Sequence, residues 1–283
     1  MGLFTFSLDG CYKFEGDQTV PAYLKIDSIS VVTYFPEEGT SSSKITDVWA
    51  YLDDNLVGVF ELPALFPVLA RGKHKLQLKA GIMLNGISST RVPYPFYLPV
   101  DYADFEFYED SVQVPPVLTT EYYPGLNFAW MEDFENEGLK IDETSISDTV
   151  IERTQEGAFI TPTSKYSGVI HLTTEKPIYS AVSYDLYPMP KAGTPTMLEM
   201  NFKTDNLFNV GLLIQEQGQI IKLPLVILAH SSEWNKIYIN LGPNLSLHSK
   251  ATGFKVLLEG GLELEKQSAT IYLDNIKMIY RNL

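Results

Sequence analysis

Apolar and polar residues alternate along most of this 283-residue chain in short runs of strand length. In the first part of the chain, the runs that predict β-strands are residues 24–32, 47–52, 56–62, 74–80 and 105–112. Turn-forming clusters such as Asp53-Asp54-Asn55 and Asn85-Gly86 separate these runs, and Asn-Gly is a strong hairpin signal. No long stretch has the i, i+3, i+4, i+7 apolar spacing of an amphipathic helix. Short strands separated by turns predict an all-β sandwich fold.

The same alternation of apolar and polar residues continues in the second part of the chain. It is clearest in residues 197–203, where apolar positions 198, 200 and 202 alternate with polar positions 199, 201 and 203. Further runs of strand length are residues 167–172, 209–214, 223–228, 233–241, 254–258 and 269–280.

Prolines divide the two parts. In residues 92–99 they alternate with aromatic residues, which predicts an edge or an extended connection because proline lacks the amide that a ladder needs. Further prolines within residues 114–125 predict a semi-rigid spacer that holds the second domain away from the first. We therefore predict an Ig-like β-sandwich over residues 23–114, a Pro-rich linker over 115–125 and a second β-sandwich over 126–283.

Charge narrows the choice of partners. The chain has 35 acidic and 21 basic residues, a net charge of −14, which argues against nucleic acid and against electrostatic docking on anionic lipid. No run of about eighteen apolar residues predicts a membrane span. The negative charge does not argue against neutral ligands such as glycans.

Cys11 is the single cysteine, so no internal disulfide forms. It follows Leu8-Asp9-Gly10 and a short apolar run, an arrangement that resembles a bacterial lipobox, in which the chain is cut before a cysteine that then carries lipid. The resemblance implies that residues 1–22 are a signal-peptide remnant, lipobox and tether, and that only acyl chains on Cys11 attach the protein to a membrane. A small buried thiol is the alternative.

Two further segments resemble known families. Residues 51–63 with 72–81 are similar to small PEGA-like surface domains, in which His74 is expected to pack within a strand. Asp133-Phe134-Glu135, the run from Trp234 to Leu241 and Ile271-Tyr-Leu-Asp-Asn-Ile276 resemble the jelly-roll domains of bacterial carbohydrate-binding modules. An anchored Ig-like domain followed by a jelly roll is similar to surface lipoproteins of the Bacteroidota type, which implies the outer-membrane surface as the location.

The jelly-roll resemblance also implies candidate site residues. Glu135 and Asp274 match positions that share a structural calcium ion, the alternatives being a solvated strand-end charge and a hydrogen-bonding turn residue. Trp234 matches a tryptophan position of the family and is a candidate ligand-binding residue; the family's tryptophan commonly packs near a strand start, so a core position is the alternative. From the residues alone, the aromatic pair Tyr184 and Tyr187 with Asp185 beside them predicts a sugar-stacking surface, again with a core tyrosine as the alternative.

No catalytic motif is present: the chain lacks HExxH, GxSxG and a Gly-rich phosphate loop, and we predict no catalytic residue. The resulting hypothesis is a non-catalytic surface lipoprotein whose jelly roll binds carbohydrate, with the Ig-like domain as spacer or partner contact. One alternative is an accessory subunit of a secretion, uptake or adhesion assembly, in which the aromatic residues of segment 92–99 would contact a surface protein. A glycoside hydrolase is the second alternative.

Overall fold

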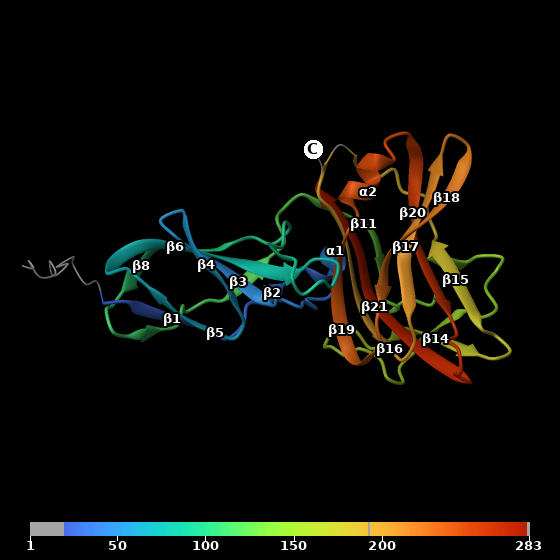
Figure 1. The fold of residues 1–283 in the computed structure, drawn as a ribbon, viewed down its shortest axis with the longest axis horizontal. Helices are drawn as coiled ribbons and strands as arrows, with labels where there is room; N and C mark the ends of the chain where they lie inside the picture. Colours follow the sequence, from blue (N-terminus) through green and yellow to red (C-terminus); the bar gives the residue numbers. More distant parts are fainter. Residues whose placement is uncertain (1–19, 192, 282–283) are drawn as a thin grey trace, which may run out of the picture.

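A computed structural model describes residues 20–191 and 193–281. Within them the fold is all-β, as the alternation predicts, and consists of two β-sandwich domains along the long axis of the molecule (Figure 1). The described part contains two short helices, α1 (Phe35–Glu38) and α2 (Gly242–Leu247). No helix in it has the length and apolar content that crossing a membrane requires.

The first domain contains ten strands. They are β1 (Ala22–Ile26), β2 (Ser30–Val32), β3 (Asp47–Leu52), β4 (Asn55–Glu61), β5 (Ala64–Val68), β6 (Gly72–Met83), β7 (Arg91–Pro93), β8 (Val100–Phe107), β9 (Val112–Gln113) and β10 (Thr119–Glu121). One sheet has the order β4-β3-β6-β7, with β8 also paired to β6, and a smaller sheet has the order β5-β1-β9. Leu76, Leu78 and Ala80 form the buried face of β6 and are at most 3% exposed, whereas His74, nearer the start of the strand, is half-buried.

The segment predicted as a linker is partly strand. Residues Thr119–Glu121 form β10, which pairs in parallel with β2 of the first domain. The aromatic residues of segment 92–99 are also inside the protein, since Tyr94, Phe96 and Tyr97 are at most 4% exposed. Tyr94 and Tyr122 also bond to Glu199 of the second domain, so the two domains contact each other directly instead of being held apart by a proline spacer.

The second domain contains eleven strands. They are β11 (Leu126–Glu132), β12 (Ile141–Glu143), β13 (Ile151–Thr154), β14 (Ser167–Thr173), β15 (Ile178–Ser183), β16 (Thr196–Thr204), β17 (Phe208–Glu216), β18 (Gln219–Leu228), β19 (Ser231–Asn240), β20 (Ala251–Gly261) and β21 (Ser268–Arg281). Six of them form the sheet β13-β14-β21-β16-β19, in which β11 also pairs with β21; we call it the β21 sheet. The other five form the sheet β12-β15-β20-β17-β18, which we call the β17 sheet.

The core of the second domain follows the alternation. Leu198, Met200 and Phe202 of β16 belong to the cluster of buried side chains between the two sheets. Phe134 also lies in this cluster, and a side chain at Gly168 would overlap its ring, so glycine is required there. The polar residues of β16 point the other way, toward the outer face of the β21 sheet, where the first domain sits.

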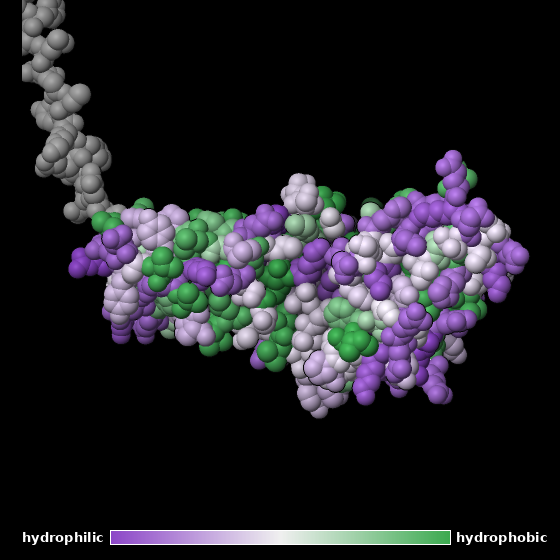
Figure 2. Space-filling view, turned by 90° about the horizontal axis from the view of Figure 1, so that it is seen from below, coloured by the Kyte–Doolittle hydropathy of each residue, from purple (hydrophilic) through white to green (hydrophobic). Residues whose placement is uncertain are grey.

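The surface differs between the domains. Figure 2 shows apolar side chains gathered over the first domain, whereas the visible face of the second domain is mostly hydrophilic. On β4, the last strand of its sheet, Leu56, Val57 and Val59 are 37–50% exposed. Leu65 of β5 is 60% exposed.

Candidate ligand-binding site at the domain junction

A short segment of the first domain, residues 39–44, lies across the outer face of the β21 sheet; we call it the strap. It follows α1, which is at the junction of the domains (Figure 1). The strap bonds in turn to three neighbouring strands, β21, β16 and β19. Its bonds are Lys277 Nζ to the Thr40 carbonyl (2.6 Å), the Ser42 hydroxyl to Asn201 Oδ1 (2.8 Å) and the Lys44 amide to the Tyr238 hydroxyl (2.9 Å).

A backbone contact joins the domains nearby. The turn after β6 brings Leu84 beside Tyr238 of β19 in a parallel bridge, and the Asn85 amide donates to the Tyr238 carbonyl at 2.8 Å. The Asn85 side chain accepts a bond from the Asn240 amide at 2.8 Å. Since β19 is the last strand of its sheet, this turn covers an edge that would otherwise be free.

A buried charge cluster lies under the strap. Glu199 of β16 has no exposed surface and forms an ion pair with Lys236 at 2.6 Å. Its Oε1 accepts bonds from the hydroxyls of Tyr94 (2.5 Å) and Tyr122 (2.8 Å), both from the first domain. Burial works to raise the pKa of Glu199, but the charges of Lys236 and Lys277 hold it below its ordinary value. The carboxylate therefore stays charged and ties the two domains together.

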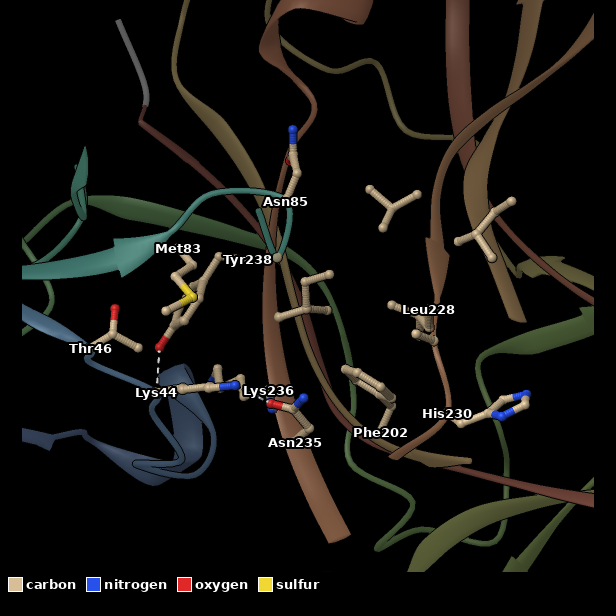
Figure 3. Close-up of a pocket in the computed structure, with 15 residues that line it drawn as sticks. Lys44, Thr46, Met83, Asn85, Phe202, Leu228, His230, Asn235, Lys236 and Tyr238 are labelled. Atoms are coloured by element: carbon tan, nitrogen blue, oxygen red, sulfur yellow. Dashed lines mark hydrogen bonds between the residues drawn. The ribbon is translucent and has the colours of Figure 1, made fainter. Parts of the chain in front are cut away.

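Two adjoining cavities open beside the strap, and we call them together the junction groove. Both are lined by Lys44, Asn235 and Lys236. The narrower has a volume of about 220 Å³, and Figure 3 shows Lys44 and Met83 on its first-domain side with Phe202 and His230 opposite. The wider has a volume of about 460 Å³. The junction groove therefore offers ligand-sized space where the two domains meet at the edge strand β19 of the β21 sheet.

Aromatic rings form one end of the wider cavity. Trp234 of β19 and Phe159 both line it, half-buried, with ring centroids 5.5 Å apart in an edge-to-face arrangement. The Trp234 ring is held in place because its Nε1 donates to the Gly157 carbonyl at 3.1 Å. Tyr272 packs edge-on at 6.2 Å, and the Lys203 ammonium lies 5.6 Å from the indole. The indole is therefore fixed before any ligand arrives.

Polar groups line the rest of the wider cavity. Asn201 and Asn235 use their side-chain oxygens to accept bonds from Ser42 and Lys44, so each oxygen is oriented toward the strap. Their amide nitrogens make no hydrogen bond within the described residues, which leaves donors for a ligand. Ser43 adds a hydroxyl from the first domain. A fixed ring surrounded by amides and hydroxyls suits a ligand with an apolar face and many hydroxyl groups.

The structure separates the four predicted ligand-binding residues. Trp234 lies in the junction groove, on the β21 sheet. Tyr184, Asp185 and Tyr187 follow β15 of the β17 sheet, where Tyr184 is 60% exposed and Asp185 is exposed. Tyr187 is half-buried, and burial together with the charge of Asp185 raises its pKa to about 12. These three residues form one surface segment, and Trp234 belongs to a different surface.

The two predicted calcium ligands, Glu135 and Asp274, lie near enough for their charges to interact. Asp274 is fully buried, and burial, then the charges of Asp133 and Glu135, raise its pKa to about 8. Its oxygens accept bonds from the Ser167 hydroxyl and the Asn275 amide at 2.6 Å each. Crowded carboxylates of this kind favour a bound cation.

One carboxylate oxygen of Glu135 is left without a hydrogen-bond partner among the described residues. Oε1 accepts from Ser164, Lys165 and Tyr166, while Oε2 has no partner among the described residues. Calcium takes carboxylate and backbone oxygens, so a calcium ion held by Glu135 and Asp274 stays a prediction. Among residues 20–191 and 193–281, no group of three or more His, Cys, Asp or Glu side chains has the arrangement of a metal site. Cys11, the predicted lipid carrier, lies outside the described residues.

The chain matches no protein-family model and no curated protein. Among solved structures it is similar to a xylan-binding domain of carbohydrate-binding module family 22, with 13% identity over 55% of this chain and 96% of that chain and a TM-score of 0.41. A second similar structure is a carbohydrate-binding module of the β-sandwich superfamily, with 13% identity, 82% and 84% coverage and a TM-score of 0.40. A third is a family 11 module from Clostridium thermocellum, with 13% identity, 53% and 95% coverage and a TM-score of 0.36.

The sequence did not identify most of the groove. Ser42, Ser43 and Lys44 belong to the first domain, and the run of serines carries no chemical motif. The alternation in β16 predicts that Asn201 lies on the outer face of the strand, beside Glu199. That Glu199 is buried, and that something therefore covers this face, is visible only in the structure.

Proposed function

We propose that this protein binds carbohydrate in the junction groove. The observation that carries the proposal is the fixed Trp234 ring, which lines one cavity together with Phe159, Asn201 and Asn235. A sugar ring offers an apolar face to an aromatic ring and hydroxyls to amides. The residue-level resemblance of residues 133–135, 234–241 and 271–276 to carbohydrate-binding modules supports the same ligand class.

We propose binding without hydrolysis. Glycoside hydrolysis requires two carboxylates on either side of the scissile bond. Of the described residues that line the wider cavity, Glu233 is the carboxylate, and the narrower cavity contributes none. Glu199 is near, but it is fully buried and engaged by Lys236. The residues that line the groove therefore suit the binding of a sugar better than the cleavage of its glycosidic bond.

In this proposal the first domain forms part of the site. Ser42, Ser43 and Lys44 make one wall of the groove, and the Lys44 ammonium donates to Asn235 Oδ1 at 2.6 Å, which orients that amide. A ligand in the groove would touch both domains. Binding is accordingly expected to require the intact chain.

The test is affinity electrophoresis of the full chain in gels that contain xylan, mixed-linkage β-glucan or polygalacturonate. We expect at least one polysaccharide to retard the wild type, and Trp234→Ala to weaken that binding by roughly tenfold or more, because a central aromatic contact is lost. The matched control is Tyr184→Ala, an exposed aromatic residue on the β17 sheet. Retardation lost in Tyr184→Ala and kept in Trp234→Ala would transfer the site to the segment after β15.

A second candidate function is contact with a surface protein. It is favoured by the exposed apolar residues Leu56, Val57 and Val59 on β4, whose outer edge has no neighbouring strand in the described part of the chain. Such an edge is a template for pairing with another chain. Recovery of a stoichiometric partner by the wild type and not by Val57→Lys would support this function.

We further propose that Cys11 carries lipid and places the protein on the outer-membrane surface. Support comes from the single cysteine and from the lipobox-like residues before it. The junction groove and the exposed β4 edge would then face the medium or neighbouring envelope proteins.

A further inference from the structure

A separate cavity of about 250 Å³ lies beside the strap, next to α1, and we call it the α1 cavity. Phe35 contributes from the first domain, and Met131, Asn275 and Lys277 contribute from β11 and β21. Exposed residues such as Lys140 also line it, so it reaches solvent. Trp234 and Asn235 are not among its lining residues, so it is distinct from the junction groove.

A break in the β-ladder places Asn275 in this cavity. The register between β16 and β21 shifts between Glu199 and Asn201, and Asn275 adopts a positive φ of 48° there. Asparagine tolerates this left-handed conformation better than most residues. The side chain is 1% exposed and accepts a bond from the Thr40 hydroxyl, but its amide nitrogen has no hydrogen-bond partner. A buried donor without an acceptor is costly.

Lys277 places a second donor in the cavity. It is 2% exposed, and its stem packs against Gly39, where an added side chain would come within 3.1 Å. The ammonium donates to one acceptor, the Thr40 carbonyl. Glu199, which lies under the strap, is already paired with Lys236 and bonded to two tyrosines.

The charge of Lys277 is therefore poorly compensated. Burial, then the neighbouring charge of Lys236, lower its pKa to about 7. A buried ammonium is stable only when an anion or several acceptors face it. The Lys277 ammonium and the Asn275 amide nitrogen therefore both have N–H groups without an acceptor oxygen in this cavity.

We propose that the α1 cavity binds a carboxylate group of a small acid, which accepts bonds from the Lys277 ammonium and the Asn275 amide. A carboxylate supplies several lone pairs and the missing negative charge in one group. Lys140 adds a positive charge at the mouth. Asp133 also lines the cavity, but its Oδ1 accepts a bond from the Glu135 amide at 3.2 Å. The acid is either an acidic sugar or a simple organic acid, and the two share the same carboxylate chemistry.

The test is isothermal titration of the full chain with sodium D-glucuronate, sodium acetate and D-glucose at constant ionic strength. We expect glucuronate to bind saturably and glucose to bind roughly tenfold more weakly or worse, because glucose lacks the charged acceptor. Lys277→Met keeps the apolar stem and should abolish glucuronate binding. Lys255→Met, on the β17 sheet, is the matched control and should bind as the wild type does.

Each outcome decides the proposal. Acetate binding as tightly as glucuronate would keep the site and assign it to simple acids, whereas tighter glucuronate binding assigns it to acidic sugars. Equal glucuronate binding by wild type and Lys277→Met would overturn it, as would the absence of saturable binding by either carboxylate. These results are independent of Trp234→Ala, which tests the junction groove alone.

A second measurement uses the wild type, in case Lys277→Met fails to fold. The side-chain pKa of Lys277 is followed by nitrogen-15 NMR with and without saturating glucuronate. Charged groups around it are Lys236 on β19, Glu199 on β16, Glu38 on α1 and Asp133 after β11. A bound carboxylate favours the ammonium, so the pKa of Lys277 should rise by about one unit or more. An unchanged pKa at saturation would place the ligand elsewhere and refute the proposal.

Discussion

Replacing Glu199 with glutamine tests whether the buried ion pair joins the two domains. Glutamine has nearly the same shape, so Glu199→Gln removes the charge and leaves packing almost unchanged. Lys236 would then be buried, with 2% of its side chain exposed and no anion beside it. Lys277 would lose a neighbouring negative charge as well. The two tyrosine hydroxyls would keep an acceptor, but one without charge.

The cost follows from these contacts. Removing one partner of a buried ion pair destabilises a protein by about 3–5 kcal/mol. For a chain of this size that corresponds to a fall in Tm of about 6–20 °C. An exposed carboxylate has a much smaller effect, within about 0.5 kcal/mol, so Glu137→Gln is the matched control. The double variant Glu199→Gln with Lys236→Met should recover part of the loss, because it also removes the lysine that pairs with Glu199.

The assay is urea unfolding of the full chain, followed by circular dichroism at pH 7. The expected result is a lower midpoint for Glu199→Gln than for wild type and Glu137→Gln. The depressed pKa of Glu199 means that its contribution is present above its ordinary pKa of 4.5 and is lost as the pH falls through its lower folded value. Equal midpoints for wild type and Glu199→Gln at pH 7 would refute the argument that this ion pair holds the domains together.

Cys11→Ser should move the protein out of the membrane fraction of a bacterial host that processes lipoproteins; unchanged fractionation would exclude the anchor. Calcium chloride should raise the Tm of the wild type and not that of Asp274→Asn, and an equal response of both chains would exclude this metal site. Lys277→Met should gain stability relative to wild type as the pH falls from 10.5 to about 7, because over that range the unfolded wild-type chain holds a proton that the folded chain lacks. The midpoints of urea unfolding, measured for both proteins across this pH range, test this change. A stability difference between them that does not vary with pH would contradict it.

The local pattern of the chain was sufficient to predict the sheets. Alternation in residues 197–203 assigned Leu198 to the core and Glu199 to the opposite face, as found, because neighbouring side chains of a strand point to opposite sides. The prolines of segment 115–125 suggested a spacer, but Thr119 and Thr120 within it favour a strand, and they pair with β2. Local signals could not reveal that pairing, since its partner lies far away in the sequence.

The site was less accessible to sequence reasoning. Trp234 could be named because the family resemblance marks it, whereas Ser42 and Asn201 meet across 159 positions of sequence. The aromatic residues of segment 92–99 suggested an exposed contact for another protein. Tyr94 is instead buried against Glu199 of the same chain, because aromatic residues suit contacts within a chain as well as contacts between chains.

The backbone bridge between Leu84 and Tyr238 bears on how this protein can be dissected. A fragment that starts at residue 126 would leave the β19 main chain unsatisfied and would uncover Met197, Tyr238 and Ile279, which pack in the core of the first domain. Such a fragment is expected to self-associate during purification. Loss of activity on truncation would then reflect aggregation, so point substitutions in the intact protein are the sound way to map its functions.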